Sequence, residues 1–198
     1  MRRLRAVIAH RWRGWLVLGA LVVVGLRTDP RTVEHWGDNY QIALPVLALA
    51  CEATNGGALE YAGRYAVMFV GLHGTKRALG ETPLNARPRG GYEGFPSGHT
   101  ATATFGAANL MTSCVKRQPV VQTAIALAAG YTGASRIATG WHDIWQVMAG
   151  AIWGILCALA FGKGRAPRRL LVRAWAWRRN RRAAPSETCP PKMCPPET

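Results

Sequence analysis

Acidic residues are scarce in this chain of 198 residues, which has ten Asp and Glu against 25 Lys and Arg and a formal net charge of +15. Such a positive excess is typical of proteins that bind nucleic acids or anionic membranes. The basic residues gather at the two ends, with five arginines in residues 1–13 and ten Lys or Arg after Phe161. A nucleic-acid-binding domain would instead carry them along one face of its fold. We therefore expect a bilayer with anionic lipids as a partner, and no nucleic acid.

Metal-binding patterns are also missing from the sequence. Cys51, Cys114 and Cys157 lie in apolar stretches, so we expect them to be small core residues. Cys189 and Cys194 lie in a proline-rich tail without the histidine partners of a zinc site. The polar loops described below hold no carboxylate cluster of the kind that binds Mg²⁺. We expect no metal and no other cofactor.

Apolar residues make up 49% of the sequence and occur in six segments between the basic ends. Several segments are shorter than the roughly 20 residues of a full membrane span. Flanking Trp, Arg and Tyr side chains can complete such a span in the membrane interface. We therefore expect an all-α fold, a bundle of six transmembrane helices. The segments are Trp12–Leu26, Tyr40–Ala53, Leu59–Leu72, Thr100–Cys114, Val120–Thr139 and Ile144–Phe161.

The basic residues also predict an orientation. Six crossings would place three basic regions on the same side of the membrane: residues 1–13, the pair Lys116 and Arg117, and the tail. The positive-inside rule predicts that this side is cytoplasmic. The first segment resembles a signal peptide, but no small-x-small cleavage site clearly follows it, and we expect a retained span. The expected regions are a cytoplasmic basic N-terminus (1–11), a six-span catalytic domain (12–162) and a basic, partly disordered cytoplasmic tail (163–198).

Polar side chains concentrate in two long loops on the opposite side, 73–99 and 134–143. Arginine offers planar, bidentate donors to phosphate oxygens, and a glycine before a helix lets backbone N–H groups approach an anion closely. Of two histidines, one can attack phosphorus and the other can protonate the leaving oxygen. The loops supply Lys76, Arg77, Arg87, Arg89, Ser97, Gly98, His99, Ser135, Arg136, His142 and Asp143.

Three motifs in these loops resemble the signatures of the type 2 phosphatidic-acid phosphatase (PAP2) superfamily. They read ARP (86–88), PSGH (96–99) and SRIATGWH (135–142), and GDNYQIALP (37–45) resembles a further stretch in bacterial members. The similarity covers about residues 35–160. It implies a six-span lipid phosphatase of the bacterial inner membrane, with its active site facing the periplasm or exterior.

The resemblance also implies roles for individual residues. His142 would be the nucleophile that forms a phosphohistidine, and His99 the general acid. The phosphate oxygens would be bound by Lys76, Arg87, Ser97, the Gly98 N–H and Arg136, with Gln146, Ser135 and Pro96 in support.

The chain departs from the family pattern at two places. The lysine that usually lies seven residues before the motif arginine is replaced by Gly80, and an apparent insertion moves the nearest lysine back to Lys76, with Arg77 as its alternative. The aspartate usually four residues after the nucleophile is Gln146. A glutamine carbonyl can accept the Nδ1–H of His142 but supplies no negative charge, so we expect a milder nucleophile. Asp143 is expected to cap the following helix.

Three functions fit these residues. We expect hydrolysis of the terminal phosphate of a lipid phosphate or diphosphate, such as undecaprenyl diphosphate, phosphatidylglycerol phosphate, phosphatidate or lipid A phosphate. A phosphotransferase that moves phosphate from a polyprenyl diphosphate to another lipid would share every motif. A non-catalytic lipid-binding membrane protein is the third possibility, supported by the displaced lysine and by Gln146.

Overall fold

The computed structural model describes residues 33–160 without a gap, together with residues 12, 14–17, 19, 173, 176–177 and 179. All regular structure in this part of the chain is helical, which confirms the all-α class. The elements are α2 (Val33–Thr54), α3 (Ala58–Leu79), the short 3₁₀ helix η1 (Pro83–Asn85), α4 (Gly98–Asn109), its π-helical continuation η2 (Leu110–Cys114), α5 (Pro119–Ala138) and α6 (Ile144–Ala160).

Helix α4 is the centre of the bundle and packs against α2, α5 and α6. Its sequence is rich in Ala, Gly and Thr, so neighbouring backbones can come close to it. A Cβ added at Gly106 would lie 2.4 Å from the backbone nitrogen of Pro45 on α2. A Cβ at Gly150 of α6 would lie 2.3 Å from the carbonyl oxygen of Ser97, just before α4. These contacts hold α6 against the start of α4 and α2 against its later turns.

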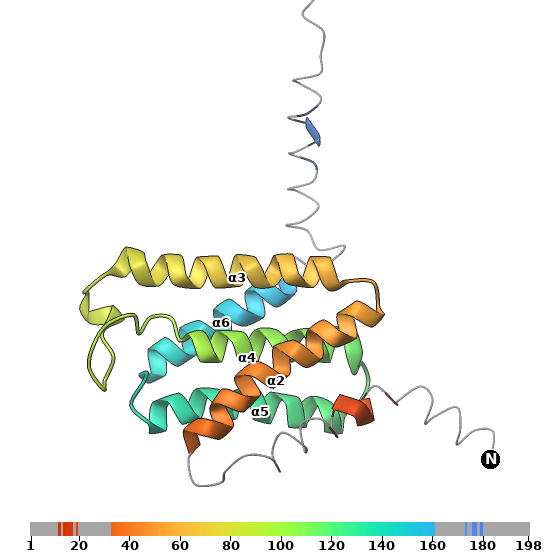
Figure 1. Cartoon of the computed structure of the whole chain (residues 1–198), viewed down its shortest axis with the longest axis horizontal. Helices are drawn as coiled ribbons and strands as arrows, with labels where there is room; N and C mark the ends of the chain where they lie inside the picture. The colour runs from red at the N-terminus through yellow and green to blue at the C-terminus, as the bar shows by residue number, and fades with distance from the viewer. Residues whose placement is uncertain are drawn as a thin grey trace, which may run out of the picture.

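The two polar loops lie at the same end of the bundle (Figure 1). Helix α3 runs toward this end and α4 runs away from it, so the long connection between them (80–97) lies there. Helix α5 also ends there, and residues 139–143 join it to the start of α6. The first turns of α2 reach the same end. The fold therefore brings together the ends of five helices and two loops.

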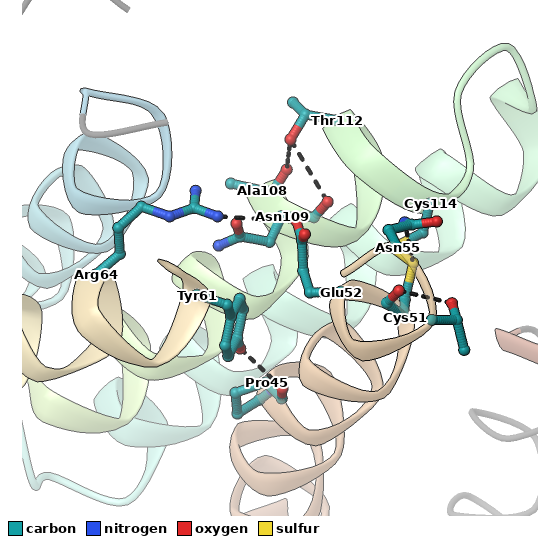
Figure 2. The surroundings of a disulfide bond; sticks show 11 residues. Pro45, Cys51, Glu52, Asn55, Tyr61, Arg64, Ala108, Asn109, Thr112 and Cys114 are labelled. Atoms are coloured by element: carbon teal, nitrogen blue, oxygen red, sulfur yellow. Dashed lines mark hydrogen bonds and ion pairs between the residues drawn. A yellow bond between two sulfur atoms is a disulfide. The ribbon is translucent and has the colours of Figure 1, made fainter. Parts of the chain in front are cut away.

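A disulfide bond lies at the opposite end of the bundle (Figure 2). It joins Cys51, in the last turns of α2, to Cys114 at the end of η2. Cys114 is buried in the core and Cys51 packs against it, as expected, but the bond between them was not predicted: the packing of α2 against η2 brings together residues 63 positions apart. Cys157 is free and buried, as expected.

A polar network accompanies the disulfide (Figure 2). Arg64 of α3 forms an ion pair with Glu52 of α2 and donates a hydrogen bond to the carbonyl of Ala158. Tyr61 of α3 donates a hydrogen bond to the carbonyl of Pro45 in α2. These contacts tie α2, α3 and α6 together away from the polar loops.

The expectation of six membrane-spanning helices is only partly met. Five of the predicted segments coincide with α2 to α6. In the described part of the chain, no helix has both the length and the apolar character that a membrane crossing requires. The first predicted segment, residues 12–26, lies mostly outside the described residues, as do the N-terminal region 1–11 and all but four positions of the tail 163–198.

Candidate active site

Two histidines from distant parts of the sequence line one cavity of about 450 Å³ at the polar end of the bundle. His99 lies in the first turn of α4, and His142 lies in the connection between α5 and α6. Three cationic side chains, Lys76, Arg87 and Arg136, line the same cavity. Gly98 also lines it, so the positive end of α4 faces the cavity interior. The cavity is therefore suited to an anion with several oxygens.

The side chain of Gln146 determines which nitrogen of His142 carries a proton. Its Nε2 donates hydrogen bonds to the carbonyl oxygens of Leu84 (3.2 Å) and Ala86 (2.7 Å), so its Oε1 is the atom 3.1 Å from His142 Nδ1. An amide oxygen only accepts, so Nδ1 must carry the proton. The lone pair of Nε2 is then free for attack on phosphorus. Burial above all, together with the nearby cations Lys76 and Arg87, lowers the pKa of His142 to about 4, although the hydrogen bond to Gln146 opposes this shift.

Replacing Gln146 with glutamate is expected to shift the pH dependence of this imidazole. A carboxylate next to His142 favours the imidazolium, so the pKa of His142 should rise and the acid limb of kcat/KM should move to higher pH. Glutamate cannot donate to the carbonyls of Leu84 and Ala86, which should lower the thermal stability. NMR titration of His142 and a thermal unfolding scan measure the two effects.

A matched control is Gln122→Glu, which removes a hydrogen bond to the carbonyl of Met111 at a distance from the cavity. This variant should leave the titration of His142 unchanged. An unchanged titration in Gln146→Glu would contradict the contact between Gln146 and His142.

The insertion in the first motif does not remove its lysine from the cavity. Lys76 is 6% exposed and lines the cavity, with its Nζ donating to the carbonyl of Glu93. Asn85, fully buried, holds the inserted loop: its Nδ2 donates to the carbonyls of Lys76 and Gly80, and its Oδ1 accepts from Phe95 N. Burial and the charge of Arg87 lower the pKa of Lys76 to about 8. The alternative cation, Arg77, is exposed and does not line the cavity.

Arg87 of the first motif and Arg89, which directly follows the motif, stack on one indole ring. The guanidinium carbons of Arg87 and Arg89 lie 5.5 Å and 4.5 Å from the ring centre of Trp141. Arg87 also donates to the carbonyl of Glu93, and its buried Nε has no hydrogen-bond partner among the described residues. Trp141 donates its Nε1–H to the carboxylate of Glu34. The loop that carries Arg87 is thereby held over the connection that carries His142.

Arg136 is the most deeply buried cation of the site, at 2% exposed. Its Nε donates to Ser135 Oγ (3.2 Å) and its Nη2 to the carbonyl of Glu34 (2.9 Å). Its Nη1 lies 3.1 Å from Asp38 Oδ1 and 3.9 Å from Glu34 Oε1. The guanidinium is therefore held between α5 and α2. Its role in binding phosphate stays a prediction.

The remaining predicted residues lie behind the cavity wall. Ser97 is fully buried, and its Oγ is 3.0 Å from Thr100 Oγ1, so the hydroxyl does not line the cavity. Its backbone N–H donates to the carbonyl of Gln146. Ser135 donates to the carbonyl of Thr132, and Pro96 is buried outside the cavity lining. Asp143 accepts from the Gln146 N–H at 2.8 Å, which confirms that it caps α6.

Sequence reasoning missed three residues that shape the site, namely Glu34, Asp38 and Asn85. The first two come from α2, more than 90 residues before His142 in the chain. The only signal for Asp38 was its position in the stretch GDNYQIALP. Asn85 stands one residue before the ARP motif, and a polar residue in a loop is not by itself informative.

A family model described as the PAP2 superfamily matches residues 54–169, which is more than half of the chain. The protein belongs to the PAP2 superfamily. The matched range contains the three motifs, the two histidines and Gln146, whereas Glu34 and Asp38 of this PAP2 protein precede it. No curated protein and no solved structure gives a significant match. Membership of the PAP2 superfamily supports a phosphatase-type, hydrolytic activity in general.

Proposed function

We propose that this PAP2 protein hydrolyses the terminal phosphate of a lipid phosphate or diphosphate through a phosphohistidine on His142, without a metal ion. The observation that carries the proposal is the contact between Gln146 Oε1 and His142 Nδ1, which leaves Nε2 unprotonated on an imidazole that lines a cationic cavity. A phosphatase needs a neutral nucleophile, a proton donor and positive charge around the transferred phosphoryl group. His142, His99 and the three cations can supply them.

The reaction proceeds in two balanced steps. In the first, His142 Nε2 forms a bond to phosphorus while the bond from phosphorus to the leaving oxygen breaks, and His99 gives its proton to that oxygen. In the second, water attacks phosphorus and the P–N bond breaks, while the neutral imidazole of His99 takes a proton from the water. Lys76, Arg87 and Arg136 stabilise the charge on the phosphoryl oxygens in both transition states.

An apolar groove beside the cavity supports a lipid as the substrate. The groove has a volume of about 330 Å³ and shares Gln41, Tyr65 and Thr102 with the cavity. Its other walls are side chains of α2 and α3, among them Ile42, Val46 and Leu49, whose apolar surfaces are exposed. An apolar chain in this groove would have its phosphate beside the two histidines. We place the protein at a bacterial inner membrane, with the cavity on the periplasmic or outer side.

Phosphate release from a panel of lipids tests this function. The purified protein, in detergent micelles, is incubated with undecaprenyl diphosphate, phosphatidylglycerol phosphate, phosphatidate or lipid A, each with and without EDTA. We expect release from at least one lipid, at a rate that EDTA leaves unchanged. Loss of activity with EDTA would contradict a metal-independent reaction, and no release from any lipid would favour a binding protein. Transfer of phosphate to an added lipid acceptor, in place of release, would identify a phosphotransferase.

A further inference from the structure

The cavity holds a carboxylate that faces the proton donor instead of the nucleophile. Asp38 of α2 lies with its Oδ1 3.4 Å from His99 Nε2 and 3.1 Å from Arg136 Nη1. Beside His142, by contrast, the facing side chain is the neutral amide of Gln146. The negative charge of Asp38 therefore acts on the second histidine.

Asp38 Oδ1 lies within ion-pair distance of His99 Nε2 but without hydrogen-bond geometry, and the two groups form an ion pair when the imidazole is protonated. Asp38 Oδ1 is buried and, among the described residues, has no hydrogen-bond partner. An acceptor in that position is best satisfied by a positively charged neighbour. Asp38 therefore favours the protonated form of His99 by its charge, without a hydrogen bond to Nε2.

We propose, on the basis of the phosphatase function above, that Asp38 is a positioning residue that keeps His99 protonated for its role as general acid. The proton on His99 passes to the leaving oxygen when the P–O bond breaks, and the proton taken from water in the second step restores it. Asp38 is not protonated at any stage. It stabilises the imidazolium of His99 before the first transfer and as it forms again in the second, and it pairs with Arg136 throughout.

The electrostatics of the cavity explain why His99 needs such a partner. Burial lowers the pKa of His99, and the cations Arg136, Lys76 and Arg87, from α5, α3 and the first-motif loop, lower it further. Asp38 is the group that raises it. His142 also lines the cavity, and its own low pKa keeps it neutral when His99 is protonated. The two required protonation states therefore coexist above a pH of about 4 and below the pKa of His99.

The test compares Asp38→Asn, which removes the charge but keeps the shape, with Asp38→Glu and Glu34→Gln. Glu34 is the matched control, because its carboxylate lies on the same helix and contacts Arg136 and Trp141 but forms no ion pair with His99. NMR titration of His99 in the full-length protein should show its pKa lowered by about one pH unit in Asp38→Asn. Glu34→Gln should lower the pKa of His99 much less. In Asp38→Glu, which keeps the charge, the pKa of His99 should be higher than in Asp38→Asn and closer to the wild-type value.

Activity gives a second readout. In Asp38→Asn the alkaline limb of kcat/KM for the fastest lipid of the panel should move to lower pH. Hydrolysis of p-nitrophenyl phosphate, whose leaving group needs little protonation, should be much less affected than hydrolysis of the lipid. An equal loss with both substrates, or an unchanged titration of His99, would overturn the proposal. If either result is found and the activity still requires His142, the role of Asp38 is wrong but the phosphatase function is not. If the wild-type protein releases no phosphate, the phosphatase function itself is wrong.

Discussion

Replacing His142 with alanine is expected to abolish phosphate release, with a loss of about 10³-fold or more in kcat. The alanine side chain cannot form the P–N bond. The second histidine, His99, is not expected to take over, because its Nε2 faces the Asp38 carboxylate. The cations would still bind the substrate. We therefore expect KM to change much less than kcat.

The control for this variant is His35→Ala. His35 is exposed on α2 and does not line the cavity, so its removal should leave phosphate release near the wild-type rate. Thermal unfolding shows whether each variant is folded. Full activity of a folded His142→Ala protein would contradict the proposed mechanism.

Replacing Arg136 with lysine is expected to reduce kcat/KM by about 10²-fold and to lower the melting temperature. Arg136 uses three nitrogens to contact Ser135, the backbone of Glu34 and the Asp38 carboxylate. A lysine ammonium is a single point of charge and cannot make these contacts together. In the variant, the Glu34 carbonyl and the Asp38 carboxylate of α2 cannot both keep their donor. Asp38 is then held less firmly beside His99.

The same substitution at Arg117, in the loop at the opposite end of the bundle, is the matched control. Initial rates over a range of substrate concentrations give kcat/KM, and a thermal scan gives the melting temperature. We expect Arg117→Lys to retain wild-type activity. An Arg136→Lys protein with unchanged kcat/KM would show that the guanidinium geometry is not required.

The sequence was sufficient for the parts of the site that lie in continuous motifs. A lysine with an unusual spacing, Lys76, was expected to reach the site, and the structure places it in the cavity because Asn85 holds the inserted loop against the end of α3. The contact of Gln146 with His142 follows from the spacing of four residues. Local spacing is thus informative where one helix or one short loop carries both residues.

Contacts between distant elements could not be derived in the same way. Nothing near Glu34 or Asp38 in the sequence indicates that the start of α2 lies over α4 and α5, because this depends on the packing of three helices. The disulfide between Cys51 and Cys114 was missed for the same reason. The apolar segments of the sequence are also shorter than the helices that contain them. Helix α2 begins at Val33, seven residues before the predicted segment, because its first turns carry polar residues of the site.

The most direct test of the proposed chemistry is to identify the residue that is phosphorylated during turnover. The protein is mixed with a hydrolysed lipid of the panel, quenched in alkali, under which phosphohistidine is stable, and digested for mass spectrometry. We predict a phosphoryl group on the peptide that contains His142, and none on that peptide in His142→Ala. A phosphoryl group on His99, or rapid turnover with no phosphorylated peptide, would contradict the assignment of His142 as the nucleophile.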